Sequence, residues 1–307
     1  MTVKQPHQPL IAALLIIASI LCGVNVAFAA DSPWLARLNQ YRAMAGLSSF
    51  GLLPNKTAGA NRFAKYLTDK DSTTIRAGRQ PAKEDRLQKV YYGEFYSAHS
   101  ISEFTSEPIK TPRALRPAEI IDRWMADPLY RLPLLIREPP PINVAYGQAC
   151  TADFCEAALL ASDYTLTMFS AGNPSRYDSP VLFPPNKSTL DVISLGHRSP
   201  DASANCEFKA PTGLPITLQL GRWISPKIIS GWIAENGKPV QACALDARSF
   251  LNSNTYFEHK LIQFGAIVII PRYPLQPGAK YAVHAVVADY GTYDWSFSTS
   301  VKAVVIP

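Results

Sequence analysis

Apolar residues in the N-terminal half of the chain recur every three or four positions, as they do along one face of a helix. One such face runs through residues 33–45 and stops at Gly46, and residues 57–67 repeat the pattern. A third predicted helix covers residues 117–127, with a proline at its start and another directly after its end. Residues 70–115 are polar and irregular. This half is therefore predicted to be rich in helix.

Beyond residue 141 the chain changes to short segments rich in β-branched and aromatic residues. INVAYGQA and EAALLAS, residues 142–149 and 156–162, predict the two strands of a hairpin. Residues 171–186, rich in Pro, Ser and Asn, are predicted to link two domains. At least five strand-like segments follow in residues 187–307, which is typical of a β-sandwich. They are PITLQL, KIISGWI, GAIVIIP, KYAVHAVVA and WSFSTSV.

One tyrosine of the second half stands at a characteristic place. Tyr281 in LQPGAKYAV ends a crossing between two predicted strands. The tyrosine corner of immunoglobulin-like sandwiches lies at such a crossing, and its hydroxyl bonds to the backbone a few residues upstream. Tyr281 is therefore a candidate for this role.

The first thirty residues have the pattern of a secretory signal peptide. Lys4 precedes an apolar run, and Ala27 and Ala29 form an A-x-A cleavage site directly after it. The run is slightly short for a membrane span. We therefore expect residues 1–30 to be removed and the mature protein to be secreted or periplasmic, with no transmembrane span.

Cysteine usage agrees with export. Cys22 belongs to the predicted leader, so four cysteines remain in the mature chain, an even number that favours disulfides over a metal site. Four cysteines allow three pairings. We favour Cys150–Cys155 and Cys206–Cys243, because each predicted domain then closes its own pair.

Length and charge set limits on the class of protein. The chain has 307 residues, 47% of them hydrophobic and 18% charged, which is enough for two globular domains. The net charge is +6, but the basic residues are scattered. Proteins that read nucleic acids usually carry a clustered basic face, so a nucleic-acid partner is not expected.

The N-terminal half resembles the CAP superfamily, and in particular its bacterial SCP-like members. LARLNQYRAMAGL, YYGEF and AEIIDRWMADPLYRLPLL carry the resemblance through their order and spacing. It implies an α+β protein in which residues 31–170 form a three-layer α/β/α sandwich. The second half, residues 187–307, resembles the immunoglobulin-like all-β sandwich that follows this module in some bacterial secreted proteins.

The resemblance also implies a cleft, which in the family usually holds two histidines and two acids and in some members binds zinc. The acids fall on Glu94 and Asp127, whereas Tyr130 replaces one histidine. No histidine occurs in residues 68–93, where the other should lie, and His99 stands on the wrong side of Glu94. The expected site is therefore a cleft without a metal or another cofactor.

Three interpretations of Glu94, Asp127 and Tyr130 stay open. They can form a zinc site, although a phenol is a poor third ligand. They can form a hydrogen-bonded polar cluster, or the two acids can hydrolyse a glycan. We favour a binding module with no catalytic residue, which takes a small amphipathic molecule, a lipid, a glycan or another component of the cell envelope, or which serves as a contact surface for another protein. A cell-wall or polysaccharide hydrolase that uses Glu94 and Asp127 is the alternative.

Overall fold

The fold was examined in a computed structural model, which contains both helices and β-sheets, in agreement with the α+β prediction. Residues 32–307 form one compact unit. The structure describes residues 32–53, 57–61, 100–101, 116–137, 143–150, 155–161, 174–195, 205–209, 211–251 and 255–305.

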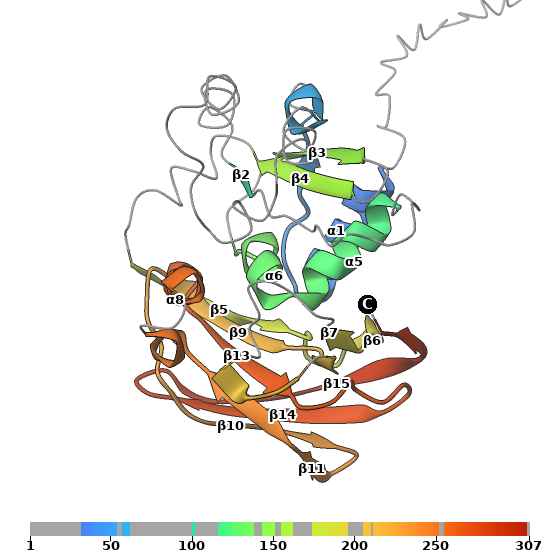
Figure 1. Ribbon diagram of the computed structural model, residues 1–307. Coiled ribbons are helices and arrows are strands. Elements are labelled where there is room, and N and C mark those ends of the chain that lie inside the picture. The colour runs from blue at the N-terminus through green and yellow to red at the C-terminus, as the bar shows by residue number, and fades with distance from the viewer. Residues whose placement is uncertain are drawn as a thin grey trace, which may run out of the picture. The chain divides into compact units, whose positions relative to one another are not determined.

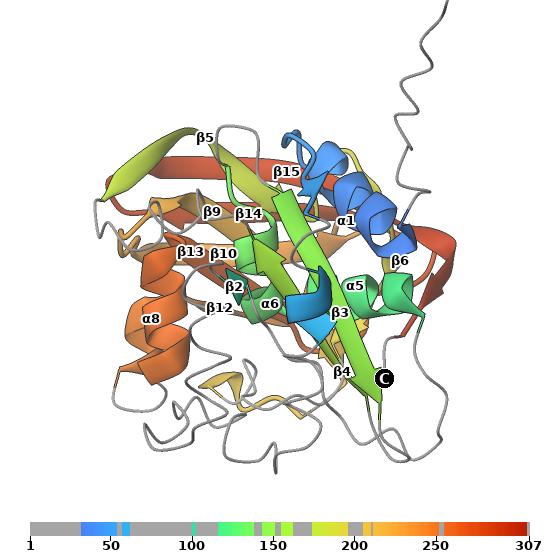
Figure 2. The same cartoon turned by 90° about the horizontal axis from the view of Figure 1, so that it is seen from above.

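Two of the predicted helices are present and pack on each other. They are α1 (Pro33–Met44) and α5 (Pro117–Ala126), which lie side by side (Figure 2). Asn39 fixes the chain after α1, because its side chain donates to the Phe50 carbonyl at 2.9 Å and accepts from the Phe50 N–H at 2.7 Å. Residues 57–61 are also helical, and residues 62–67 of that prediction lie outside the described residues.

The third predicted helix is followed by one that the sequence analysis did not include. Proline at position 128 ends α5, but it also begins α6 (Pro128–Leu134), because proline is well suited to the first position of a helix. Asp127 is both the C-cap of α5 and the N-cap of α6. The chain therefore bends at Asp127 and continues as a second, shorter helix.

A four-stranded sheet accompanies these helices, with strand order β1-β3-β4-β2. Its strands are β1 (Gly51–Leu52), β2 (Ser100–Ile101), β3 (Asn143–Cys150) and β4 (Cys155–Ala161). The antiparallel pair of β3 and β4 confirms the predicted hairpin, and Cys150 stands opposite Cys155 in its register. The side chains of these two cysteines lie outside the described residues, so their disulfide stays a prediction.

Gly147 of β3 is required by a close approach of two backbones. A Cβ atom at this position would lie 2.1 Å from the backbone carbon of Ala60, far inside van der Waals contact. Only glycine lets the short helical segment 57–61 pack this closely on the sheet.

The C-terminal half consists mainly of two further sheets, which form separate layers (Figure 1). The five-stranded sheet, or outer sheet, has the order β11 (Lys238–Val240), β10 (Ile228–Glu235), β14 (Lys280–Val287), β15 (Gly291–Val304) and β6 (Thr189–Val192). The second four-stranded sheet has the order β12 (Ala242–Leu245), β13 (Ala266–Pro271), β9 (Ile216–Arg222) and β5 (Ser175–Phe183). From here on, the four-stranded sheet, or inner sheet, means this one. The smaller elements are β7 (Ser194–Leu195), β8 (Thr212–Gly213), a 3₁₀ turn (Ala247–Phe250) and α8 (Thr255–Gln263), which packs on β13.

The two larger sheets face each other across an apolar interior. A Cβ atom at Gly231 of β10 would lie 3.0 Å from Ile269 of β13 and 3.1 Å from Ala244 of β12. The predicted disulfide Cys206–Cys243 is confirmed. The Tyr281 hydroxyl accepts from the N–H of Gln276, five residues upstream, at 2.7 Å and donates to a carboxylate oxygen of Glu235 at 2.7 Å.

The stretch predicted to be a linker contains a strand. Residues 175–183, inside the predicted linker 171–186, form β5 and pair with β9. The Pro, Ser and Asn content predicted an irregular segment. However, β5 is an edge strand, and Pro180 lies where its register with β9 is interrupted, so the missing N–H of proline costs no hydrogen bond between the strands. Residues 175–183 therefore belong to the four-stranded sheet.

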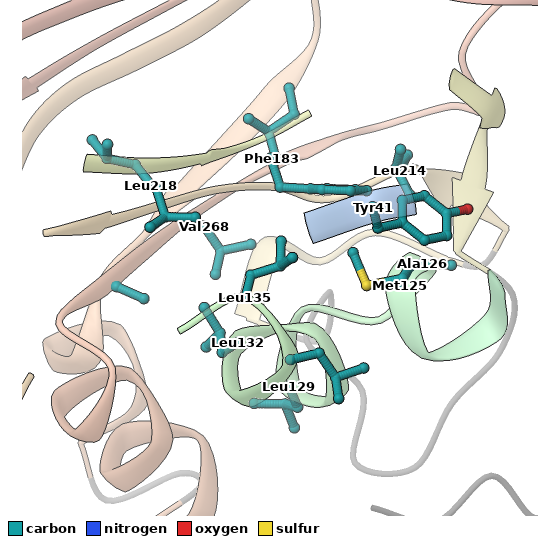
Figure 3. Packing of buried hydrophobic residues seen from close by; sticks show 14 of the residues in the cluster. Tyr41, Met125, Ala126, Leu129, Leu132, Leu135, Phe183, Leu214, Leu218 and Val268 are labelled. Carbon is teal, nitrogen blue, oxygen red and sulfur yellow. The ribbon is translucent and has the colours of Figure 1, made fainter. Parts of the chain in front are cut away.

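The two central strands of the four-stranded sheet, β9 and β13, are buried on both faces. Every residue of β9 and β13 is buried, because one face meets the five-stranded sheet and the other meets the helices. Figure 3 shows Leu132 and Leu135 beside Val268, with Tyr41 near Phe183. Residues from both halves of the chain therefore contribute to one hydrophobic core.

Candidate functional site

The structure describes two of the three predicted cleft residues. Asp127 and Tyr130 lie at the start of α6. Glu94 lies outside the described residues, as does His99, so the structure does not test whether either one joins them. The geometry of the predicted site is therefore that of the junction between α5 and α6.

Asp127 is buried, and its carboxylate has a structural role. Only 3% of the residue is exposed, and one carboxylate oxygen accepts the N–H of Leu129 at 2.8 Å. This is the hydrogen bond of an N-cap, which satisfies one of the free N–H groups at the start of α6. The carboxylate thus stabilises the bend between the two helices.

Tyr130 is the part of α6 that solvent reaches. The other six of its seven residues are buried, whereas Tyr130 is half-buried and packs against the edge of the core. Tyr130 is therefore partly accessible to solvent, whereas Asp127 is buried. A ligand that approaches α6 would meet Tyr130 before Asp127.

Arg131, which follows Tyr130, is a residue that the sequence analysis did not select. It is fully buried and donates to the carbonyl oxygens of Met125 at 2.5 Å and of Pro215 at 2.7 Å. Its guanidinium also stacks on the ring of Phe183, 4.2 Å from the centroid. Pro215 and Phe183 belong to the sandwich half, so this side chain ties α6 to the four-stranded sheet.

Burial disfavours the positive charge of Arg131, because the guanidinium is removed from water. Burial lowers the pKa of Arg131 to about 9, and the nearby carboxylate of Asp127 opposes that shift. The two residues therefore stabilise each other's charged forms inside the core. An arginine next to an aliphatic run, as in YRLPLL, was the signal in the sequence for a buried guanidinium.

A second polar group links α1, α5 and the sandwich. Arg37 Nε binds the carboxylate of Asp122 at 2.6 Å, and the hydroxyl of Tyr41 donates to the same oxygen at 2.7 Å. Arg37 also lies 4.0 Å from the carboxylate of Asp191 in β6. Burial raises the pKa of Tyr41 well above its usual value, and the negative charge of Asp122 raises it further.

Two buried side chains complete the contact of α6 with its surroundings. Gln219 of β9 donates to the carbonyl of Leu132 at 2.9 Å. Arg42 of α1 donates to the carbonyl of Leu134 at 2.7 Å and lies 3.7 Å above the ring of Phe50. The backbone of α6 is therefore held from the sheet on one side and from α1 on another.

The described residues contain no group of three or more His, Cys, Asp or Glu side chains that could hold a metal ion. This finding does not extend to Glu94 or His99, which lie outside the described residues. Within the part of the chain that the structure describes, no helix is long and apolar enough to cross a membrane.

Comparison with known proteins does not identify the chain. No protein-family model matches it, and no curated protein matches it significantly.

Proposed function

We propose that this chain is an exported binding protein that holds a component of the cell envelope without converting it. It would combine a variant CAP module with an immunoglobulin-like sandwich. The order of two helices, a β-hairpin and a two-sheet half supports this assignment, as do the motifs that end in DPLYRLPLL. The leader-like residues 1–30 support export to the periplasm or the medium.

The observation that carries the proposal is the engagement of Asp127. A general acid or base must come within hydrogen-bond reach of the group that it protonates or deprotonates. Asp127 is 3% exposed, caps α6 and neutralises a buried arginine. A residue that is committed in this way supports binding rather than hydrolysis by the pair Glu94 and Asp127.

Tyr130 is the residue through which this region would contact a ligand. Its ring is half-buried, and a tyrosine at a surface offers both an apolar face and a hydroxyl. This combination suits an amphipathic molecule or a glycan. The proposed contact needs no metal ion.

Purified cell-wall sacculi and anionic phospholipid vesicles are the probes that test the proposed function. The exported protein should co-sediment saturably with one of them and release no reducing ends from the sacculi. Tyr130→Phe, which keeps the ring and removes the hydroxyl, should weaken the binding several-fold. Release of reducing ends that Glu94→Gln abolishes would establish the hydrolase instead and overturn the binding proposal.

Export has its own test. Sequencing the N-terminus of protein recovered outside the cytoplasm should give a start near Ala30. A recovered chain that still begins with Met1 would contradict the proposed leader.

A further inference from the structure

Three side chains form a row across the face of the five-stranded sheet that points away from the four-stranded one. Trp232 of β10 stands opposite His284 of β14, and His284 stands opposite Asp294 of β15. Their neighbours along the strands point inward: Gly231 meets the other sheet, and Ile233 is fully buried. Because side chains alternate along a strand, the three residues of the row lie on the outer face.

The row is an ordered stack of flat groups. The indole of Trp232 and the imidazole of His284 are nearly parallel, at 16°, with centroids 5.1 Å apart. This separation is close to the spacing between neighbouring strands, about 4.8 Å. His284 Nδ1 lies 2.7 Å from a carboxylate oxygen of Asp294. Each group therefore orients the next, and the orientation of Trp232 is set before any ligand arrives.

The other side of Trp232 has no strand beside it. In the described residues, the pairing of β10 with β11 runs from Glu235 to Ile233, which pairs with Val240, and stops one residue before Trp232. The next residue, Gln241, already accepts a backbone hydrogen bond from Arg272, beyond β13. The stack of flat groups thus ends in an open position, and 47% of Trp232 is exposed.

The residues around the row are small and mostly polar, with the half-buried Val286 opposite Ser230 and Thr292. Ser230, Ala282, Thr292 and Ser296 are exposed neighbours on the same three strands. They form no wall around the indole, and three of them carry hydroxyl groups. The core of a protein–protein interface is larger and more apolar than one ring among small side chains. The face fits a ligand with one apolar side and a hydroxyl-bearing rim.

We propose that this row is a carbohydrate-binding site, in which a pyranose ring of a polysaccharide stacks on the open side of Trp232. The C–H groups on one side of a pyranose carry partial positive charge and are attracted to the negatively polarised face of an indole. A hydroxyl group at the rim of the sugar would reach Ser230, two residues from Trp232 on β10, whereas Thr292 and Ser296 lie on β15, beyond His284. The inference rests on the proposed binding function and deepens it, since it names the ligand class and a second surface away from α6.

Binding of two soluble probes, the β-1,4-linked hexasaccharides of glucose and of N-acetylglucosamine, tests the site by calorimetry and tryptophan fluorescence. At least one of them should bind the full mature chain. Trp232→Ala should weaken this binding about tenfold, which corresponds to about 1.4 kcal/mol and lies within the range of an aromatic contact. Trp232→Tyr, which restores a ring, should recover most of it.

Ile229→Ala is the matched control, because Ile229 is an even more exposed apolar residue of the same strand, at 58%. It should leave the binding of the hexasaccharide unchanged. Circular dichroism and thermal unfolding show whether each variant is folded, as expected for exposed positions. Equal loss in Ile229→Ala and Trp232→Ala, or a change of oligomeric state in Trp232→Ala, would mean that the face is a protein contact and would overturn the inference.

Two further results distinguish failure of this site from failure of the proposed function. If neither hexasaccharide binds the wild type, or if Trp232→Ala binds as tightly as the wild type, the carbohydrate site is wrong. The binding function would still stand if sacculi or vesicles bind and Tyr130→Phe weakens them. If the wild type cleaves sacculi, the proposed function fails, whereas a loss of hexasaccharide binding in Trp232→Ala would still support the site.

Discussion

The two large sheets of the C-terminal half differ in what covers them. All residues of β9 and β13 in the four-stranded sheet are buried, whereas β14 and the first part of β15 in the five-stranded sheet alternate between exposed and buried positions. An antiparallel sheet with one face in water shows such alternation, and a continuous buried run means that both faces are covered. The difference teaches that the helical half is part of the core of the sandwich.

The same difference explains why the described residues of the predicted site, at the start of α6, are mostly buried. The helix α6, which contains Tyr130, packs on the inner sheet through Arg131 and Gln219. The outer sheet has no described helix on its exposed face and carries Trp232. The covered sheet thus uses polar side chains for stability, and the uncovered sheet leaves an aromatic side chain, that of Trp232, exposed to solvent.

The largest effect is expected at the guanidinium that joins α6 to the inner sheet. Arg131→Met should lower the free energy of unfolding by about 3–5 kcal/mol, because it removes two buried hydrogen bonds and the positive charge beside the buried carboxylate of Asp127. Urea unfolding measures the change. Arg176→Met is the control: Arg176 also lies over a ring, that of Tyr290, and donates to a carbonyl, but it is exposed.

Arg176→Met should change the free energy of unfolding by less than about 0.5 kcal/mol, as is usual at the surface. Similar losses in the two variants would mean that burial does not distinguish Arg131 from the exposed Arg176 of β5, and would contradict the role of Arg131 as a buried tie between α6 and the inner sheet.

One valine on each sheet gives a smaller and closely matched contrast. Val268 of β13 is 2% exposed and faces α6, whereas Val286 of β14 is half-buried on the outer face. Val268→Ala should cost about 2 kcal/mol, from two lost methylene equivalents and the remaining cavity, and Val286→Ala less than about 1 kcal/mol. Thermal and urea unfolding report both values. Equal costs would indicate that solvent reaches Val268.

Alkaline pH should separate a tyrosine at the helix–sheet contact from one at the end of the outer sheet. The pKa of Tyr41 is raised well above its usual value by burial, so the unfolded chain loses this proton first, near pH 10. Stability should then fall as pH rises above 10, by up to about 1.4 kcal/mol per pH unit from this residue. Arg131 acts in the opposite direction, since its pKa is lowered, so the difference between variants is measured.

Tyr41→Phe should cost about 1–2 kcal/mol at neutral pH through the lost hydrogen bonds to Asp122 and Arg37, and it should make the alkaline decline shallower. Tyr293→Phe should have a smaller effect on the slope, because Tyr293 is only half-buried. Urea unfolding at pH 8 and pH 10.5 provides the data. An unchanged slope in Tyr41→Phe would contradict the buried, protonated state of this residue.

The smallest effect on stability is expected at Tyr130. Tyr130→Phe keeps the ring that packs at the edge of the core, so the free energy of unfolding should change by less than about 0.5 kcal/mol. Urea unfolding gives this value, and the sedimentation assay with sacculi or vesicles gives the effect on binding. A loss of more than 2 kcal/mol would show that the hydroxyl is structural and would remove Tyr130 as a ligand contact.

The sequence predicted the individual helices and strands better than it predicted which of them pack against each other. The helix from Pro33, the hairpin of β3 and β4 and the pair Cys206–Cys243 were predicted from local patterns, and the structure bears them out. The strand β5 was hidden because edge strands tolerate proline and polar residues. Local patterns do not show which distant segment covers a given strand. Such tertiary contacts determine that β5 forms the edge of the sheet and that β9 is buried on both faces.

The candidate site shows the same limit. Asp127 was selected for its chemical type, but its role depends on the helix that begins after it and on Arg131, whose partners Pro215 and Phe183 are distant in the sequence. Trp232 was hidden inside KIISGWI, which has the composition of a buried strand. Its exposure follows from the end of β11, which is a tertiary feature.

Equilibrium unfolding of residues 31–307, with the Cys206–Cys243 disulfide intact and followed by two probes, tests the shared core most directly. Far-ultraviolet circular dichroism follows all elements, and tryptophan fluorescence reports on Trp124 of α5 and Trp295 of β15 among others. A shared core predicts one coincident transition, with equal calorimetric and van't Hoff enthalpies, that Arg131→Met shifts as a whole. Two separate transitions, of which Arg131→Met moves only one, would show that the halves are independent domains and would contradict the account.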